Sequence, residues 1–264
     1  MSASPISQFN RALVRCPAPS VAHGLRADDV GNPDFEGIVA EHETYIAALK
    51  SAGVKVSVLP SLSEFPDAIF VEDPALVFTQ GAIALRSGAP TRAGETAAMM
   101  PVLQDNFDTV LSLPKGGTVE GGDVLVTPDA VMIGLSARTD EAGARALVSC
   151  LETLGINGRI VRTPPDVLHF KTDCSLLSED TVLCTKRLAR SGVFDHLNII
   201  LVPEDEEAAA NALRVNDVVM VGSQFPKTLE ALTQSGYEIV PLDTRQIGMI
   251  DAGLSCMSLR WFVP

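Results

Sequence analysis

A cysteine near the end of the chain and a histidine far upstream supply the two side chains needed for thiol catalysis. Cys256 lies in a short apolar segment that ends at Arg260, and His169 lies in the strand-like run 167–172. A thiolate can attack an electrophilic carbon while an imidazole transfers the protons that the reaction moves. Because cysteines and single histidines more often serve the core than catalysis, the pair needs support from other residues.

Carboxylates supply part of that support. Asp67, Glu72 and Asp73 interrupt the apolar run 65–74, and Glu120 lies in the glycine-rich turn 116–123. In a regular strand Glu72 and Asp73 would point to opposite faces, so both can reach one ligand only at a bend or at a strand end. The glycine-rich turn lacks the pattern of a phosphate or dinucleotide loop. Its glycines are expected to let the backbone approach a ligand closely.

Two arginines complete the polar set. Arg92 and Arg138 each come just before a predicted helix. A guanidinium can bind a carboxylate through two parallel hydrogen bonds, although each arginine alone is more often a surface charge. Carboxylates suit a guanidinium and arginines suit an α-carboxylate, so the combined residues predict an arginine-like amino acid as substrate.

Composition limits the classes of function. The 264 residues are 46% hydrophobic and 20% charged, as in ordinary globular proteins, and could form one large domain or two small ones. A formal charge of −13 argues against binding to nucleic acids or anionic membranes. No apolar run is long enough to span a membrane and no signal-peptide pattern is present. Five widely spaced cysteines predict free thiols in a reducing cytoplasm.

Hydrophobic periodicity predicts the helices that must position these residues. The clearest spans about 33–51, with Asn32 as its N-cap, and carries His42 on its apolar face as a structural histidine with a satisfied ring. A second helix follows 139–141 and ends before Gly155, with Cys150 in the core. A third spans about 226–235.

Between the helices, an apolar run, a tight turn and a second apolar run recur in segments 75–85, 124–133, 174–184 and 212–220. A fifth copy requires the strand 256–262 to pair with the strand 12–15 at the other end of the chain. That pairing would remove an exposed sheet edge. The pattern therefore predicts one α/β domain over residues 1–264 with fivefold pseudosymmetry; the alternative is an α/β domain whose units look alike by chance.

Motifs along nearly the whole chain resemble the dimethylarginine dimethylaminohydrolase family. This family is part of the guanidino-group-modifying (pentein) superfamily, which also contains arginine deiminases and amidinotransferases. The matching segments are His23-Gly24-Leu25, Phe65-Pro66-Asp67, Val71-Glu72-Asp73, Arg92-Ala93-Gly94-Glu95, 117–123, 134–139, Leu168-His169-Phe170-Lys171 and 251–260.

The resemblance implies a five-bladed α/β propeller of ββαβ-type units, closed by the N- and C-terminal strands. It implies that Cys256 is the nucleophile, that His169 is the general acid and base, and that Glu120 orients the imidazole and the substrate. The implied substrate contacts are Asp67, Glu72 and Asp73 around the guanidinium and α-amino groups, Arg92 and Arg138 at the α-carboxylate, Leu25 on a mobile lid within 24–31, and the backbone carbonyl of Ile250.

The activity implied is hydrolysis of asymmetric dimethylarginine or monomethylarginine to citrulline and an amine, through a covalent S-alkylthiouronium on cysteine. No metal or organic cofactor has a task in that chemistry. The expected partner is a small-molecule substrate, without nucleic acid or membrane, and a homodimer is left open. Two alternatives remain: a sister enzyme (arginine deiminase, citrulline hydrolase or amidinotransferase), and an amino-acid-binding protein without activity.

Overall fold

Five three-stranded sheets make up the framework of the protein, which is described here from a computed structural model covering residues 6–27, 30–165 and 167–264. In four units two antiparallel strands are followed by a helix and by a third strand parallel to the second. Their elements are, in order, β3 (Ala75–Phe78), β4 (Gly81–Ala84), α2 (Glu95–Asn106) and β5 (Val110–Ser112); β6 (Val124–Val126), β7 (Val131–Leu135), α3 (Glu141–Thr153) and β8 (Gly158–Arg162); β9 (Cys174–Ser178), β10 (Thr181–Cys184), α4 (Lys186–Ala189) and β11 (Asn198–Leu201); β12 (Leu213–Val215), β13 (Val218–Gly222), α5 (Pro226–Gln234) and β14 (Glu238–Leu242).

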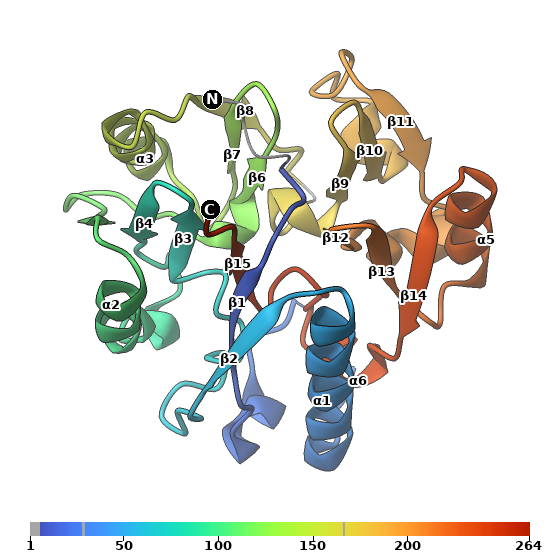
Figure 1. The fold of residues 1–264 in the computed structure, drawn as a ribbon, viewed down its shortest axis with the longest axis horizontal. Helices are drawn as coiled ribbons and strands as arrows, with labels where there is room; N and C mark the ends of the chain where they lie inside the picture. The colour runs from blue at the N-terminus through green and yellow to red at the C-terminus, as the bar shows by residue number, and fades with distance from the viewer. Residues whose placement is uncertain (1–5, 28–29, 166) are drawn as a thin grey trace.

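The fifth unit joins the two ends of the chain. Strand β15 (Leu259–Trp261) pairs antiparallel with β1 (Arg11–Arg15), and β1 pairs parallel with β2 (Lys55–Leu59) after helix α1 (Phe35–Ser51). A short helix, α6 (Arg245–Gly248), lies between β14 and β15. The expected pairing of the terminal segments is thus confirmed. In Figure 1 the five sheets surround the middle of the molecule, and α1, α2, α3 and α5 lie toward the outside.

Local chemistry explains two differences from the expected elements. Helix α1 begins two residues later than expected, because the Asp34 carboxylate, not Asn32, accepts from the Gly37 N–H at 2.8 Å. The last strand begins only at Leu259, so Cys256 lies in the turn 254–257 and not in the strand. The other two predicted helices are confirmed as α3 and α5.

Packing of helices on sheets forms several buried clusters. In one of them Leu147 and Leu151 of α3 are fully buried with Ile133 of β7, and Cys150 joins this core as predicted. His42 of α1 is 2% exposed, as a structural residue should be, but its Nε2 finds no hydrogen-bond partner among the described residues. The expectation that its ring is satisfied was therefore wrong.

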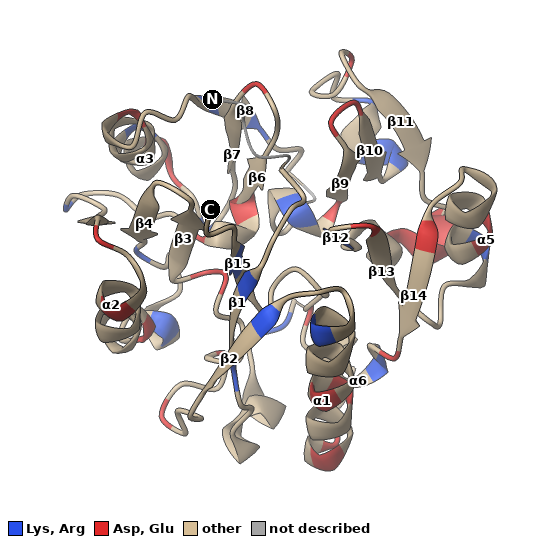
Figure 2. Cartoon of the chain, viewed as in Figure 1, with Lys and Arg blue, Asp and Glu red and all other residues tan. Residues whose placement is uncertain are grey.

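Charged residues of both signs are spread over the five units, with several acidic positions along α1 (Figure 2). All five cysteines are free thiols. Within the part of the chain that the structure describes, no helix is long and apolar enough to cross a membrane.

Candidate active site

A pocket of about 110 Å³ brings together nearly all of the residues that the motifs predict for the site. They come from turns and short 3-10 helices that connect the sheets, so the sheets act as a frame and the connections carry the chemistry. Every predicted site residue except Glu72 lines the pocket; the lining is Leu25, Arg26, Ala27, Asp67, Phe70, Asp73, Arg92, Glu120, Arg138, Leu168, His169, Ile250, Asp251, Ala252 and Cys256.

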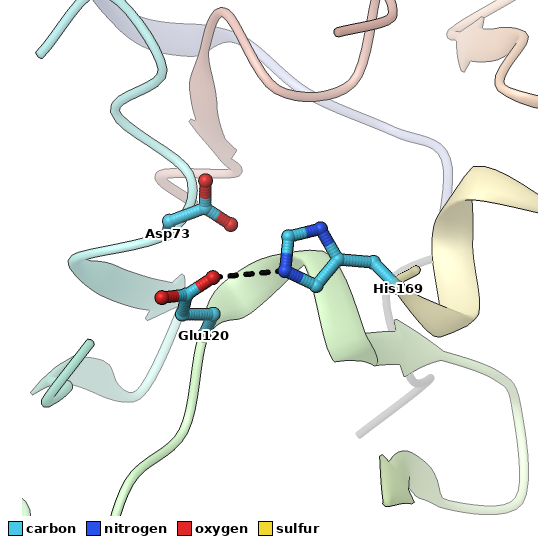
Figure 3. A group of neighbouring side chains, drawn as sticks. All are labelled: Asp73, Glu120 and His169. Carbon is cyan, nitrogen blue, oxygen red and sulfur yellow. Dashed lines mark hydrogen bonds and ion pairs between the residues drawn. The ribbon is translucent and has the colours of Figure 1, made fainter. Parts of the chain in front are cut away.

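The imidazole of His169 is held against the buried carboxylate of Glu120. His169 Nε2 and Glu120 Oε2 are 2.8 Å apart (Figure 3), and Glu120 is 1% exposed. The other carboxylate oxygen accepts from the backbone N–H groups of Gly88 at 3.1 Å and Ala89 at 3.3 Å, and from the Ser87 hydroxyl. Glu120 therefore has a fixed direction before any ligand arrives.

The backbone around His169 departs from the expected strand. A 3-10 helix, Phe170–Thr172, begins directly after it, and the side chain of Thr172 bonds both the N–H of His169 at 3.0 Å and its C=O at 2.7 Å. This local capping turns the chain before a strand can form. The strand prediction for 167–172 was therefore wrong, although it placed the imidazole at the site.

The glycine-rich turn approaches the catalytic side chains closely. A Cβ added at Gly122 would lie 2.9 Å from Nδ1 of His169, closer than real Cβ atoms approach a ring. The N–H of Gly122 also donates to Oδ1 of Asp73 at 2.9 Å. A side chain at this position would push the imidazole away from Glu120.

The charges around His169 keep it protonated. Burial opposes the charged form, but the hydrogen bond to Glu120 and the charges of Asp123 and Asp73 raise the pKa of His169 to about 9. Asp73, Glu120 and His169 could offer ligand atoms within 4.8 Å of one another. The hydrogen bond between His169 and Glu120 suits this cluster to proton transfer.

Cys256 lies at the same pocket in the turn before β15. Its C=O accepts from the N–H of Glu72 at 3.2 Å, which ties this turn to the carboxylate-rich segment 65–74. Burial, followed by the negative charges of Glu72 and Asp73, raises the pKa of the Cys256 thiol to about 11. The resting nucleophile is therefore a neutral thiol, and a cationic ligand would favour its ionisation.

The two arginines have different surroundings. Arg92 is buried, and its guanidinium donates to Glu95, to Asp73 and to the backbone carbonyls of Asp67 and Phe70. Its pKa rises further above its usual range: burial opposes the charge, but Asp73 and Glu95 outweigh it. The side chain of Arg138 is 25% exposed, and its Nη1 lies 4.0 Å from Oε1 of Glu120. Arg138 thus has the more accessible guanidinium.

Glu72 faces away from the pocket into a buried ionic network. Its carboxylate contacts Nζ of Lys171 at 2.5 Å and Nη2 of Arg260 at 3.3 Å, and it accepts from the Ser255 hydroxyl at 3.1 Å. Because segment 65–74 consists of successive turns, Asp73 lines the pocket while Glu72 supports the cysteine turn from behind. A direct substrate contact for Glu72 stays a prediction.

Asp67, Leu25 and Ile250 line the same pocket. The N–H of Leu25 donates to Oδ1 of Asp67 at 2.9 Å. Burial raises the pKa of Asp67, partly offset by the charge of Arg92. Positions 28 and 29 of the expected lid 24–31 lie outside the described residues, so the lid prediction is not tested.

Sequence reasoning missed several lining residues. Leu168 and Ala252 lie inside matched motifs but received no role, and Phe70 lies inside the carboxylate-rich segment. These positions could have been found by considering the apolar neighbours of each predicted site residue as part of the pocket. Lys171 was part of a matched motif but received no role.

Comparisons with known proteins show which family the chain resembles. The family model for arginine deiminase matches residues 61–202. The chain is 38% identical over 254 residues to an N(G),N(G)-dimethylarginine dimethylaminohydrolase of Pseudomonas aeruginosa, covering 96% of this chain and 100% of that protein.

Two solved structures resemble the fold over nearly the whole chain. A Cys-to-Ser variant of the Pseudomonas aeruginosa enzyme complexed with citrulline superposes with a TM-score of 0.93 at 37% identity, covering 96% of this chain and 99% of the other. A His-to-Gly variant of a dimethylarginine dimethylaminohydrolase, as an adduct with S-methyl-L-thiocitrulline, has a TM-score of 0.92 at 38% identity and the same coverage. The chain belongs to the dimethylarginine dimethylaminohydrolase family, as the motifs around Cys256, His169 and Glu120 predict.

Proposed function

We propose that this protein hydrolyses N-methylated arginines, asymmetric dimethylarginine and monomethylarginine, to citrulline and dimethylamine or methylamine. The observation that carries the proposal is the His169–Glu120 pair, 2.8 Å apart, lining one pocket with Cys256. The 38% identity to a dimethylarginine dimethylaminohydrolase, over 96% of the chain, supports the same reaction.

The first half of the reaction forms a covalent intermediate on Cys256. Binding of the guanidinium cation beside the thiol stabilises the thiolate, and the thiol proton passes to water. The sulfur attacks the guanidinium carbon and forms an S–C bond. His169, protonated at neutral pH because its pKa is about 9, donates a proton to the methylated nitrogen. The C–N bond then breaks and the amine departs. An S-alkylthiouronium remains on Cys256.

The second half returns the enzyme to its starting state. Neutral His169 accepts a proton from a water molecule, and the oxygen attacks the same carbon. Collapse of this adduct breaks the C–S bond and returns the electron pair to sulfur. The hydroxyl proton of the adduct passes to the thiolate through water, so citrulline forms with its new urea oxygen and Cys256 becomes a neutral thiol again. Proton transfer by a positioned group of this kind contributes about 10²–10⁴-fold in rate.

The charged side chains divide the binding of the substrate. Asp73 and Glu120 hold the guanidinium and favour its conversion to a tetrahedral carbon. Asp67 and the carbonyl of Ile250 bind the α-amino group, and Leu25 covers the bound ligand. Arg138 clasps the α-carboxylate, because its guanidinium is the more exposed of the two arginines. Arg92 assists mainly by fixing Asp73, with which it forms a buried ion pair.

A sister activity is the second candidate. The match to the arginine deiminase family model over residues 61–202 favours it. An arginine deiminase would use the same nucleophile, acid and carboxylates and differ in whether ammonia or methylamine leaves. An added methyl in an apolar pocket changes binding by only about 1–3 kcal/mol, so the choice of substrate depends on small differences in the pocket.

Product analysis tests the function. Citrulline and released amine should be measured with arginine, monomethylarginine and asymmetric dimethylarginine at equal concentrations. Citrulline from both methylated forms, with methylamine and dimethylamine and little ammonia from arginine, is the expected result. Faster citrulline and ammonia from arginine would assign the deiminase activity. Binding without turnover of any of the three would indicate an amino-acid-binding protein.

The arrangement of the five sheets supports a single-domain, five-bladed propeller over residues 1–264, with β15–β1 pairing as its closure. Free cysteines suit a reducing cytoplasm as the working compartment. A homodimer stays a prediction, which light scattering can check.

A further inference from the structure

The side-chain amide of Asn211 contacts the sulfur of Cys256. Nδ2 of Asn211 donates to Sγ over 3.7 Å, and Oδ1 accepts from the backbone N–H of Ser255 at 3.2 Å. Asn211 is 9% exposed and follows the 3-10 helix Glu204–Ala210, more than 40 residues before the cysteine turn. One amide therefore touches the nucleophile and the backbone that presents it.

The cysteine turn is shaped around this amide. A Cβ added at Gly253 would lie 2.3 Å from Cγ of Asn211 and 2.6 Å from its Nδ2, so a larger residue could not fit without moving the amide. The C=O of Gly253 also accepts from the N–H of Cys256 at 3.3 Å. Glycine at this position allows Asn211 and Cys256 to approach each other.

The charges near the sulfur make such a donor useful. Burial and the carboxylates of Glu72 and Asp73 disfavour the thiolate, while Lys171 acts in the opposite direction. An amide N–H donates more strongly to a thiolate than to a thiol, because hydrogen bonds to charged groups are about twice as strong as neutral ones. The 3.7 Å contact is long, but such contacts often shorten when substrate and charge are present.

We propose that Asn211 is a catalytic residue of this site, donating from Nδ2 to the Cys256 thiolate. The proposal rests on the function proposed above. Asn211 stabilises the charge on sulfur before the S–C bond forms and again when the C–S bond breaks and its electron pair returns to sulfur. The amide itself neither gives nor takes a proton. Nothing in the motif around Cys256 indicated this residue.

Two substitutions separate the donor from the backbone anchor. Asn211→Ala removes both contacts. Asn211→Asp keeps an oxygen for the Ser255 N–H, removes the N–H donor and adds a negative charge beside the sulfur. Asn157→Asp is the matched control, because Asn157 is exposed and its amide donates to a surface carbonyl, that of Asp129 at 3.2 Å.

The rate at which iodoacetamide alkylates Cys256 should be measured by peptide mass spectrometry from pH 7 to 10.5. This rate depends on the fraction of Cys256 that is thiolate. Loss of the donor should raise the pKa of Cys256 in Asn211→Ala by about one unit. Because the wild-type pKa is already about 11, the change appears in this range as a lower alkylation rate at every pH. At pH 8 alkylation should slow by only about threefold, because a more basic thiolate is intrinsically more nucleophilic. Asn211→Asp should be slower still, and Asn157→Asp unchanged. The partly exposed Cys16 serves as an internal reference thiol in every sample.

Turnover and thermal unfolding complete the test. We expect kcat to fall about tenfold in Asn211→Ala with KM little changed, since the contact is to the nucleophile. An alkylation profile equal to wild type in both Asn211 variants would overturn the proposal and leave Asn211 as an anchor for Ser255. If wild type releases no citrulline from methylated arginines while the profiles still shift, the proposed function fails and the contact to sulfur stands.

Discussion

Replacing Glu120 by glutamine should convert His169 from a protonated acid into a neutral imidazole at working pH. Glutamine has the shape of glutamate and can still accept from the Gly88 and Ala89 N–H groups. It removes the charge and the acceptor that lie 2.8 Å from Nε2, while the burial that opposes protonation remains. The pKa of His169 should therefore fall from about 9 toward its ordinary value of 6.5, with the charges of Asp123 and Asp73 still favouring the protonated form.

The size of the effect follows from these values. At pH 8 wild-type His169 is about 90% protonated, whereas a pKa of about 6.5 in the variant would leave about 3% protonated, so kcat should fall by up to about 30-fold. At pH 6 both are mostly protonated, the variant to about three quarters or more, so the part of the loss that comes from protonation should nearly vanish. The carboxylates of Glu72 and Asp73, which raise the pKa of Cys256, are unchanged in the variant.

The assay is amine release from asymmetric dimethylarginine by wild type and Glu120→Gln between pH 6 and 9. Glu206→Gln is the control, since Glu206 is a buried carboxylate that caps α5 through Thr228. With S-methyl-L-thiocitrulline, whose thiolate leaves without needing a proton, the variant should lose much less activity. A loss that is equal at pH 6 and pH 9, or equal for both substrates, would refute the role given to Glu120.

Three further predictions test the nucleophile, the carboxylate clasp and a buried histidine. Cys256→Ser should abolish turnover while binding of dimethylarginine, measured by calorimetry, persists; mass spectrometry of quenched wild type should find the substrate adduct on Cys256, and an adduct on another cysteine would contradict the assignment. Arg138→Ala should weaken binding of methylated arginine about ten- to a hundredfold, the loss of one charge-assisted contact of about 1.5–3 kcal/mol, but leave a methylated guanidine without a carboxylate unaffected; equal losses for both ligands would mean a structural role. Burial lowers the pKa of His42 to about 4, so its stabilising effect is complete above the unfolded value of 6.5 and is lost as pH falls toward 4, by up to about 3 kcal/mol. Urea unfolding of wild type and His42→Leu at pH 7.5 and pH 4.5 should show a smaller pH dependence in the variant, and parallel curves would count against this account.

The sequence alone determined the units of the fold and the identity of the reacting groups. Alternating apolar runs with tight turns predicted the hairpins β3–β4, β6–β7, β9–β10 and β12–β13, because these pairings are local. The repeat itself required the two ends of the chain to supply the fifth unit, and β1 does pair with β15. Motif residues such as Cys256 and His169 were found because their chemistry is carried by residue type.

Tertiary structure decided which way the side chains face and how they ionise. Glu72 and Asp73 are neighbours in the sequence and lie in one turn, 71–74. Of the two, Asp73 lines the pocket, whereas the carboxylate of Glu72 contacts Lys171. Arg92 and Arg138 looked equivalent until burial and the contacts to Asp73 and Glu95 distinguished them. No sequence pattern around Asn211 predicts its role. It lies 45 residues from Cys256 in the sequence, and the two residues meet through the tertiary fold. Hydrogen-bond direction and pKa depend on distance and burial, and both arise only when segments far apart in sequence are packed together.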